Sequence, residues 1–374
     1  MRYVELFAGA GGMSRGLEAA GLTPMAHCEI AEHARAVLRY RWPTTPLYGD
    51  VLALDGRSFQ GAAIVSGGSP CQDLSVAGKR AGLEGVRSGL FYEQVRIWRE
   101  SNATYCVWEN VYGALSSNRG ADFAAVLSAL VGSPVVIPGD GWERAGVAAG
   151  CEAVAAWRVI DLLEFGLPQR RTRVFCLAAR AGGVDPAQVL RIGPRGIGCD
   201  PTTQFFQASV ATVIASDDEA SGYHCLIHGQ DLNECGCVVA HYDCVKCGEW
   251  TSCLHYERSD GCQHCGESFR PLWTPDAIGA LTDGAHNGGG TNGQDFYTGR
   301  VIVQDGRARR LVPIETERLM GWPDDWTRYG IKKDGGQYEL PDAARFRLCG
   351  NGVASACVEW FARRLVALEA GGSA

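Results

Sequence analysis

The sequence predicts an α/β fold built on a doubly wound, mostly parallel sheet, with a small irregular zinc-bearing domain inserted into it. Three observations support this prediction. Short apolar runs alternate with segments of helical spacing along the first half of the chain. The first of these runs ends in a glycine-rich turn. Eight of the 16 cysteines crowd into residues 225–265, away from the apolar runs.

The chain opens with a strand predicted at 3–7, a glycine-rich turn at 7–12 and a helix at 13–20. In nucleotide-binding α/β folds this order turns backbone N–H groups toward the ligand. The turn lacks the third glycine of the dinucleotide fingerprint at its usual offset. It therefore does not indicate a dinucleotide cofactor.

Two acids end the next strand-like segments. Glu29 follows a strand predicted at 24–28, and Asp50 ends a short segment that contains Tyr48. A carboxylate in such a place suits a ribose diol, and the alternative for Glu29 is an ordinary surface acid. Two carboxylates without a phosphate-binding lysine favour a nucleoside that carries positive charge. S-adenosylmethionine, a sulfonium, fits that description.

The run at 62–65 predicts a buried strand that ends in Gly-Gly-Ser-Pro and delivers Cys71 to the edge of the sheet. The glycines allow a sharp turn just before the thiol. The following residues are polar and cationic, including Ser75, Lys79 and Arg80, and predict a loop that closes over an anionic ligand. Cys71 is a candidate nucleophile, and the alternative is a buried, inert thiol.

Two further strand-like segments carry candidate catalytic groups. Glu109 follows a strand predicted at 105–108, where Trp108 could shield it enough to keep it protonated as a general acid. A solvated acid is the alternative. Arg171 and Arg173 alternate along an extended segment, so both could face one cleft. The alternative for the two arginines is a solvated basic edge.

Composition is typical of a soluble globular protein, with 46% hydrophobic and 21% charged residues among 374. The net charge of −7 argues weakly against a nucleic-acid partner, but six arginines and a single acid lie between residues 168 and 199. The first apolar residues belong to a predicted strand, so we expect no signal peptide. No apolar run approaches membrane-spanning length, so we expect no membrane span and a protein in the cytoplasm. We also expect a monomer.

Cysteine spacing predicts metal binding in the middle of the chain, because a reducing compartment disfavours disulfides. Two C-x-x-C-G turns separated by fourteen residues match a structural zinc site. Its ligands would be Cys244, Cys247, Cys262 and Cys265. Candidates for a second zinc site are Cys225, His228, Cys235 and Cys237, with which His241, Cys253 and His255 compete. The alternative is a loosely ordered insert with reduced thiols.

Five motifs, in this order, resemble those of cytosine-C5 DNA methyltransferases from bacteria and phages. They are Phe7-Ala8-Gly9-Ala10-Gly11-Gly12, Gly68-Ser69-Pro70-Cys71-Gln72, Glu109-Asn110-Val111, Gln169-Arg170-Arg171-Thr172-Arg173 and Gly350-Asn351-Gly352-Val353. The resemblance covers roughly residues 1–180 and 275–365. The middle of the chain lies outside it.

The resemblance implies roles for individual residues. Cys71 would attack C6 of cytosine, Glu109 would act as the acid at N3, and Arg173 with Arg171 would support the flipped base. The residues placed around S-adenosylmethionine are Phe7, Gly9, Gly11, Glu29, Asp50, Leu90 and Asn351. Gln72 and Ser75 would begin the DNA-binding loop that also carries Lys79 and Arg80.

The implied organisation is a catalytic domain at 1–185 plus 345–374 and a target-recognition domain at 186–344, with the zinc insert at about 224–266. The implied activity is site-specific methylation of cytosine at C5 in double-stranded DNA. A cognate restriction endonuclease acting separately is a candidate partner. Two alternatives stay open: an RNA cytosine-C5 methyltransferase acting on tRNA, and a catalytically silent zinc-containing protein that only binds DNA.

Overall fold

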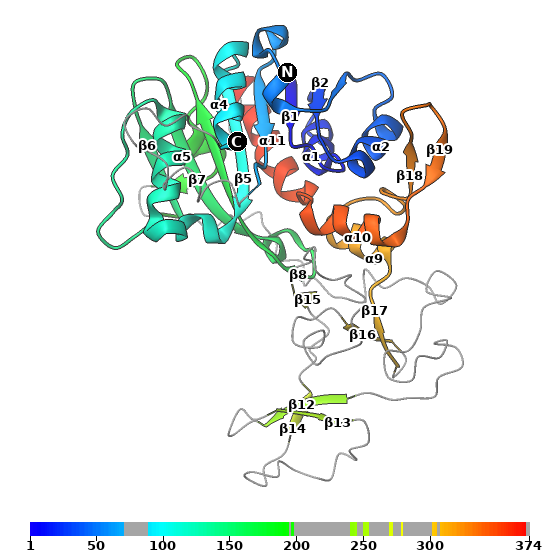
Figure 1. Cartoon of the computed structure of the whole chain (residues 1–374). Helices are drawn as coiled ribbons and strands as arrows, with labels where there is room; N and C mark the ends of the chain where they lie inside the picture. The colour runs from blue at the N-terminus through cyan, green and yellow to red at the C-terminus, as the bar shows by residue number, and fades with distance from the viewer. Residues whose placement is uncertain are drawn as a thin grey trace.

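The structure is a computed structural model that describes both ends of the chain in detail and short strands in between (Figure 1). The backbone is described for residues 1–70, 89–193, 196–197, 240–244, 250–253, 269–271, 278–279, 301–304 and 307–371. Side chains are described for residues 1–70, 89–191 and 310–371.

An eight-stranded sheet forms the centre of the large body, with strand order β3-β2-β1-β4-β5-β9-β7-β6. The strands are β1 (Arg2–Leu6), β2 (Thr23–Cys28), β3 (Leu47–Tyr48), β4 (Ile64–Gly67), β5 (Tyr105–Val111), β6 (Ala145–Ala149), β7 (Val154–Asp161) and β9 (Thr172–Ala179). The five neighbouring strands β3, β2, β1, β4 and β5 pair in parallel. Strand β9 is antiparallel to both β5 and β7. The sheet is therefore mostly parallel, as expected.

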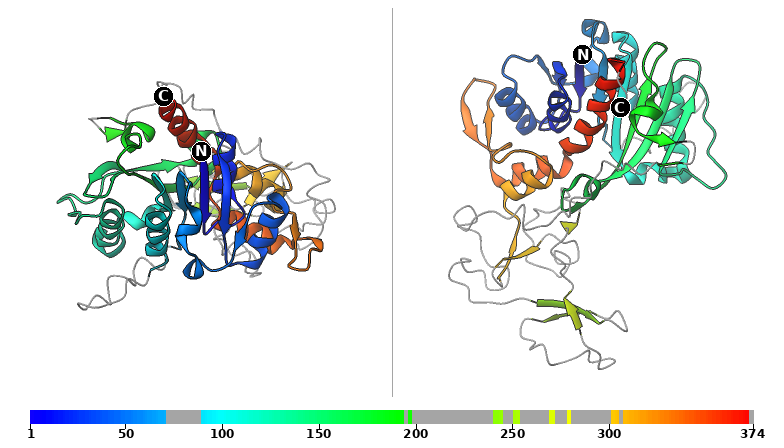
Figure 2. Two further views of the ribbon diagram at one scale, coloured as in Figure 1. Left: turned by 90° about the horizontal axis from the view of Figure 1, so that it is seen from above. Right: turned by 180° about the vertical axis from the view of Figure 1, so that it is seen from behind.

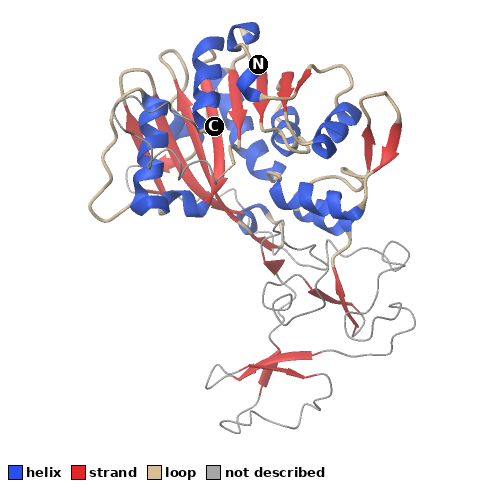
Figure 3. Cartoon of the chain, in the orientation of Figure 1, coloured by secondary structure: helices blue, strands red, loops and turns tan. Residues whose placement is uncertain are grey.

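Helices cover both faces of this sheet (Figures 2 and 3). The helices are α1 (Gly12–Ala19), α2 (Glu32–Arg41), α4 (Leu90–Ser101), α5 (Ala121–Val131), α6 (Pro186–Val189), α9 (Pro313–Leu319), α10 (Asp342–Asn351) and α11 (Ser355–Glu369). Side chains of β1 alternate between two cores: Tyr3 packs with α1, α2 and α11, whereas Val4 and Leu6 pack with α4 and α5. The doubly wound prediction is confirmed.

The remaining strands form small sheets. Strand β8 (Gln169–Arg170) pairs in parallel with β15 (Ile278–Gly279), which joins the middle of the chain to the large body. Strands β16 (Val301–Gln304) and β17 (Arg307–Arg310) form a hairpin that leads back to α9. Strands β12 (Ala240–Cys244), β13 (Trp250–Cys253) and β14 (Phe269–Pro271) form a separate sheet that lies apart from the large one in Figures 1 and 2. Two hairpins complete the set: β10 (Ile192–Gly193) with β11 (Gly196–Ile197), and β18 (Tyr329–Ile331) with β19 (Gln337–Glu339).

Both described ends of the chain build the same core. Gly16 of α1 lies against Ser355 and Val358 of α11, so closely that only a glycine fits. Leu311, Leu319, Met320, Trp322, Trp326 and Leu340 also belong to the core cluster that holds α1 and α2. This segment lies within the range 186–344 that the sequence assigned to target recognition, yet its side chains pack on the large body.

None of the helices within the described ranges combines the length and apolar character that a membrane crossing requires.

Candidate active site

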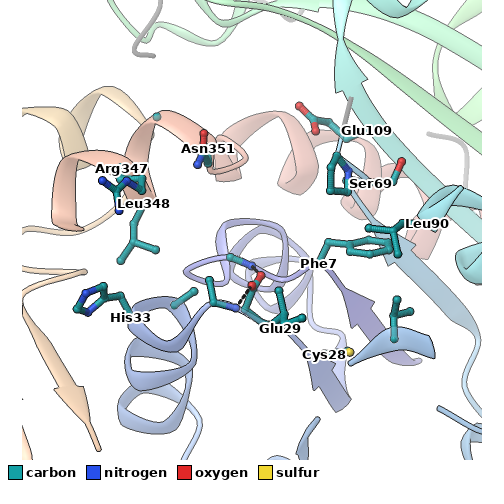
Figure 4. A pocket seen from close by; sticks show the side chains of 18 of the residues that line it. Phe7, Cys28, Glu29, His33, Ser69, Leu90, Glu109, Arg347, Leu348 and Asn351 are labelled. Atoms are coloured by element: carbon teal, nitrogen blue, oxygen red, sulfur yellow. Dashed lines mark hydrogen bonds between the residues drawn. The ribbon is translucent and has the colours of Figure 1, made fainter. Parts of the chain in front are cut away.

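A cavity of about 620 Å³ opens where the parallel strands end (Figure 4). Its walls come from the residues after β1, β2, β4 and β5, which reach one edge of the sheet because these strands run in parallel. Helix α10 closes the opposite side with Arg347, Leu348 and Asn351. Ligands of open α/β sheets bind at this edge, so the cavity is the candidate cofactor site.

The glycine loop after β1 is held by Glu29. The Gly9 N–H donates to Glu29 Oε2 at 2.8 Å, and the Ala31 N–H donates to Oε1 at 2.7 Å. Phe7 and Gly9 both have a φ of 54° and both line the cavity. The carboxylate thus joins the loop to the start of α2 and stands beside the space that a nucleoside would fill.

Most other residues predicted to bind the cofactor face the same space. Asp50 lines the cavity and accepts a hydrogen bond from the Leu52 N–H at 2.9 Å. Leu90, the first residue of α4, and Asn351, the last of α10, line it as well. Asn351 stands just before the turn that separates α10 from α11.

Gly11 differs from this set. It is not among the described residues that line the cavity, and it packs against the core instead. A methyl group on its Cα would lie 2.3 Å from the Trp42 ring, and its φ is 78°. Gly11 is thus required by the turn and by close packing.

Glu109 and Arg173 face each other at the end of the cavity near β5. Arg173 Nε lies 3.2 Å from Glu109 Oε1, and the Glu109 side chain is only 10% exposed. Burial raises the pKa of Glu109, while the positive charges of Arg173 and Arg171 oppose that rise. The arrangement provides a carboxyl group that holds its proton more tightly than an exposed glutamate does.

The turn that leads to Cys71 is anchored on β5. Trp108 Nε1 donates to Ser69 Oγ at 3.0 Å, and Asn110 Nδ2 donates to the Ser69 carbonyl at 3.0 Å. A methyl group on Gly68 would lie 2.9 Å from Glu109 Oε2, so a larger residue there would displace the Glu109 carboxyl group. Pro70 lines the cavity together with Glu109 and Arg173. The next residue, Cys71, lies outside the described residues.

Arg171 has a different environment from Arg173. Its side chain is buried, and Nη2 donates to the carbonyls of Gly350 and Gly352 at 2.9 and 2.7 Å. Burial lowers its pKa to about 9. The guanidinium therefore joins the start of β9 to the turn between α10 and α11, next to Asn351.

Several cavity residues were not predicted from the sequence. Ile30 lines the cavity and is 76% exposed, which is unusual for an isoleucine. Its position directly after Glu29 is the sequence signal that could have identified it as a cavity residue. His33 and Arg347 enter the cavity from α2 and α10. Only the packing of these two helices brings them together, so no local pattern could have found them.

The remaining predicted residues lie outside the described side chains. They are Cys71, Gln72, Ser75, Lys79, Arg80 and all eight predicted zinc ligands, of which Cys244 is described by its backbone in β12 alone. Among the side chains that are described, no three His, Cys, Asp or Glu residues form a metal-binding group. That finding does not bear on the predicted zinc ligands.

Comparison with known proteins identifies similar sequences and folds. The family model for C-5 cytosine-specific DNA methylase matches residues 1–190. Type II methyltransferase M2.BsuMI of Bacillus subtilis (strain 168) is 28% identical over 370 residues, which cover 98% of this chain and 75% of that protein. Type II methyltransferase M.HhaI of Haemophilus parahaemolyticus is 25% identical over 334 residues, which cover 87% and 85%. The crystal structure of the S. pombe Dnmt2 methyltransferase has a similar fold, with a TM-score of 0.55, 18% identity and 98% coverage of both chains.

Proposed function

This chain belongs to the C-5 cytosine-specific DNA methylase family and is a DNA (cytosine-5-)-methyltransferase, and on that premise we propose how its residues divide the work. The cavity binds S-adenosylmethionine, and the target cytosine is held between Cys71, Glu109 and Arg173. The observation that carries this proposal is the buried Glu109–Arg173 pair, at 3.2 Å, in the cavity that Pro70 also lines.

The chemistry of the cavity suits the methyl donor. Glu29, already a double acceptor of backbone N–H groups, has a carboxylate that can bind the ribose diol. Asp50 adds a second carboxylate, and Phe7 and Leu90 supply apolar contact. Asn351 offers an amide from the opposite side. When bound, S-adenosylmethionine supplies the methyl group that C5 of cytosine receives.

Cys71 and Glu109 make C5 nucleophilic. The Cys71 thiolate forms a bond to C6, while the Glu109 carboxyl donates a proton to N3 and draws electrons through the ring. Arg173 holds the Glu109 carboxyl in place through their ion pair. After methylation, a water molecule takes the C5 proton, the C5–C6 double bond re-forms as the C6–sulfur bond breaks, and the thiolate leaves. N3 then returns its proton to the Glu109 carboxylate.

Arg171 acts as a positioning residue. Its Nη2 donates to the carbonyls of Gly350 and Gly352, which holds Asn351 between them beside the cofactor cavity that Arg171 also lines. The arginine predicted to support the flipped base together with Arg173 therefore contributes by holding the turn between α10 and α11.

The middle of the chain recognises the DNA. The core position of Leu311 to Leu340 favours a recognition domain that extends from about residue 186 to about 310 and a catalytic domain at 1–185 plus 311–374. Zinc at Cys244, Cys247, Cys262 and Cys265 would supply folding free energy to a segment with little aliphatic core. Cys225, His228, Cys235 and Cys237 remain the candidate second site.

The target base must leave the duplex to reach the cavity, because C5 and C6 are inaccessible in paired DNA. Gln72, Ser75, Lys79 and Arg80 follow Cys71 directly and would contact the DNA around the extruded base. We further propose that the enzyme acts as a monomer in the cytoplasm. Its similarity to Type II methyltransferases favours a cognate restriction endonuclease that acts separately.

Transfer of a tritiated methyl group from S-adenosylmethionine to duplex DNA, with tRNA as the competing substrate, tests the substrate class. We expect label in C5 of cytosine in DNA, and label confined to tRNA would favour the RNA enzyme. Duplex DNA that contains 5-fluorocytosine tests the nucleophile, because fluorine at C5 cannot leave as a proton does. A covalent adduct that Cys71→Ala abolishes is expected, and its absence from the wild type would favour a silent DNA-binding protein.

A further inference from the structure

Three buried tryptophans contact the glycine loop and are not among the described residues that line the cavity. They are Trp42 at the end of α2, and Trp322 and Trp326 in the segment after α9. Trp326 Nε1 donates to the Ala10 carbonyl at 2.9 Å. The Trp42 and Trp326 rings lie 5.8 Å apart, and those of Trp322 and Trp326 lie 6.5 Å apart. We call these three residues the tryptophan cluster.

The cluster leaves no free space behind the loop. A methyl group on Gly11 would lie 2.3 Å from the Trp42 ring, and one on Gly12 would lie 2.8 Å from the Trp322 ring. Trp322 is also close to Gly352, where a methyl group would lie 2.6 Å from the ring. Trp322 thus contacts both the glycine loop and the turn that carries Asn351.

Trp326 is itself held rigidly. Arg41 Nη2 donates to the carbonyls of Asp325 and Trp326 at 2.7 and 2.9 Å, and its guanidinium lies 4.5 Å from the centre of the Trp326 ring. Arg15 lies on the same ring at 5.5 Å. The indole that reaches Ala10 is therefore fixed by α1 and α2 as well as by its own segment.

The loop needs such support because its backbone is strained. Phe7, a non-glycine residue, has a φ of 54°, a conformation that costs about 1 kcal/mol or more and persists only where the surroundings determine it. Gly9 donates its N–H to Glu29, and Ala10 accepts from Trp326, so consecutive residues of the loop are held from opposite sides.

We propose that Trp322 and Trp326 are positioning residues for the methyl donor, which keep the glycine loop in the conformation that binds it. The inference rests on the proposed function of the cavity as the S-adenosylmethionine site. Both tryptophans come from the segment that follows β17, the point where the chain returns from the proposed recognition domain. This segment therefore contributes to cofactor binding without lining the cavity.

Trp326→Phe tests the inference because it removes the indole N–H and keeps an aromatic ring. We expect the Kd of S-adenosylmethionine, measured by calorimetry, and its KM to rise roughly three- to tenfold, as loss of one buried hydrogen bond implies. The kcat at saturating cofactor and the Kd for DNA should stay unchanged. Trp157→Phe is the matched control, because Trp157 Nε1 also donates to a backbone carbonyl, that of Glu143, far from the cavity.

An unchanged cofactor Kd in Trp326→Phe, or an equal rise in both variants, would overturn the inference. If Trp326→Phe does not fold, as judged by circular dichroism, Arg41→Lys decides, since it weakens the contacts to Trp326 and leaves every tryptophan in place. A two- to fivefold rise in the cofactor Kd is then expected, and no rise would overturn the inference. Failure of the wild type to bind S-adenosylmethionine would instead remove the proposed function on which the inference rests.

Discussion

Arg173 Nε lies 3.2 Å from Glu109 Oε1, across the antiparallel pair of β5 and β9. The register places Arg173 opposite Val111, two residues beyond Glu109, so the two charged side chains lie diagonally on one face of the sheet. Both are largely buried. The ion pair is therefore set by strand register and lies at the edge of the cavity that Pro70 also lines.

Glu109→Gln should lower kcat by about 10²- to 10⁴-fold, because the amide keeps the shape of the carboxyl group but cannot deliver a proton to N3. Burial raises the pKa of Glu109, so its protonated form persists above its usual range and is lost as pH rises. The wild-type rate should accordingly fall on the alkaline side, and this fall should be absent in the variant. Single-turnover kinetics across pH measures both the loss of rate in the variant and the alkaline fall of the wild-type rate. A variant with wild-type kcat would contradict the role of Glu109 as the acid at N3.

Arg171→Met should destabilise the fold by about 2–4 kcal/mol, because the Gly350 and Gly352 carbonyls lose a buried charged donor. Urea unfolding followed by circular dichroism measures this loss. Arg170→Ala is the matched control: the neighbouring arginine is exposed, and its change should stay within about 0.5 kcal/mol. Equal losses of unfolding free energy in the two variants would show that the Arg171 contacts to Gly350 and Gly352 do not stabilise the fold.

Glu29→Gln should weaken S-adenosylmethionine binding by about 10- to 100-fold, since the charged acceptor that holds the glycine loop and faces the ribose site becomes neutral. Calorimetric titration with the cofactor gives the Kd. Asp55→Asn serves as control, because Asp55 also accepts a backbone N–H, that of Arg57, but lies outside the cavity. Unaltered affinity in Glu29→Gln would show that the carboxylate does not serve the cofactor.

Glu5 should make stability depend on pH. The buried carboxyl accepts from the Ser14 N–H at 2.9 Å, and Ser14 Oγ lies 2.7 Å from His27 Nε2. Burial raises the pKa of Glu5 to about 8 and lowers that of His27 to about 4. Because the pKa of Glu5 is raised, the free energy of unfolding falls as pH rises toward 8. Because the pKa of His27 is lowered, the free energy of unfolding rises between about pH 4 and pH 6.5, the ordinary pKa of histidine.

The two effects oppose each other below pH 6.5, so the contribution of Glu5 should be clearest between about pH 6.5 and 8. There the free energy of unfolding should fall by up to about 1.4 kcal/mol per pH unit. Glu5→Gln cannot titrate, so its unfolding free energy should be flatter by that amount in the same window. Parallel pH profiles for the two proteins, from urea titrations, would refute the assignment.

Metal analysis of the purified protein should find at least one zinc per chain. Cys244→Ser with Cys262→Ser should remove one zinc and abolish sequence-specific DNA binding, because the folding free energy of the insert depends on the metal. S-adenosylmethionine binding should persist, since the cavity is built from other residues. Cys151→Ser, at an exposed cysteine outside the predicted ligand set, should keep its zinc. Less than one zinc per wild-type chain would contradict the proposal.

Most residues that the strand ends and the family resemblance assigned to the cofactor lie around one cavity. Phe7, Gly9, Glu29, Asp50, Leu90 and Asn351 all line one cavity. Glu109 and Arg173 meet at its edge. For Phe7, Glu29, Asp50 and Glu109 the cause is simple: parallel strands end at the same edge of a sheet, so residues at or after their ends converge. Leu90 and Asn351 lie on helices, and only the packing of those helices brings them to the cavity. Gly11 is not among the described residues that line the cavity, and a glycine required for close contact with Trp42 looks the same in sequence as one that faces a ligand.

By itself, the sequence determined the order of strands and turns, and hence which polar side chains follow the parallel strands at the edge where the cavity lies. Only the tertiary structure decided that Arg171 holds the turn at Gly350 and Gly352, and that Trp326 supports Ala10. Those contacts join residues 179, 181 and 316 positions apart. Spacing along a chain reports local conformation, whereas such contacts arise from how whole elements pack, and that is settled only when the core closes.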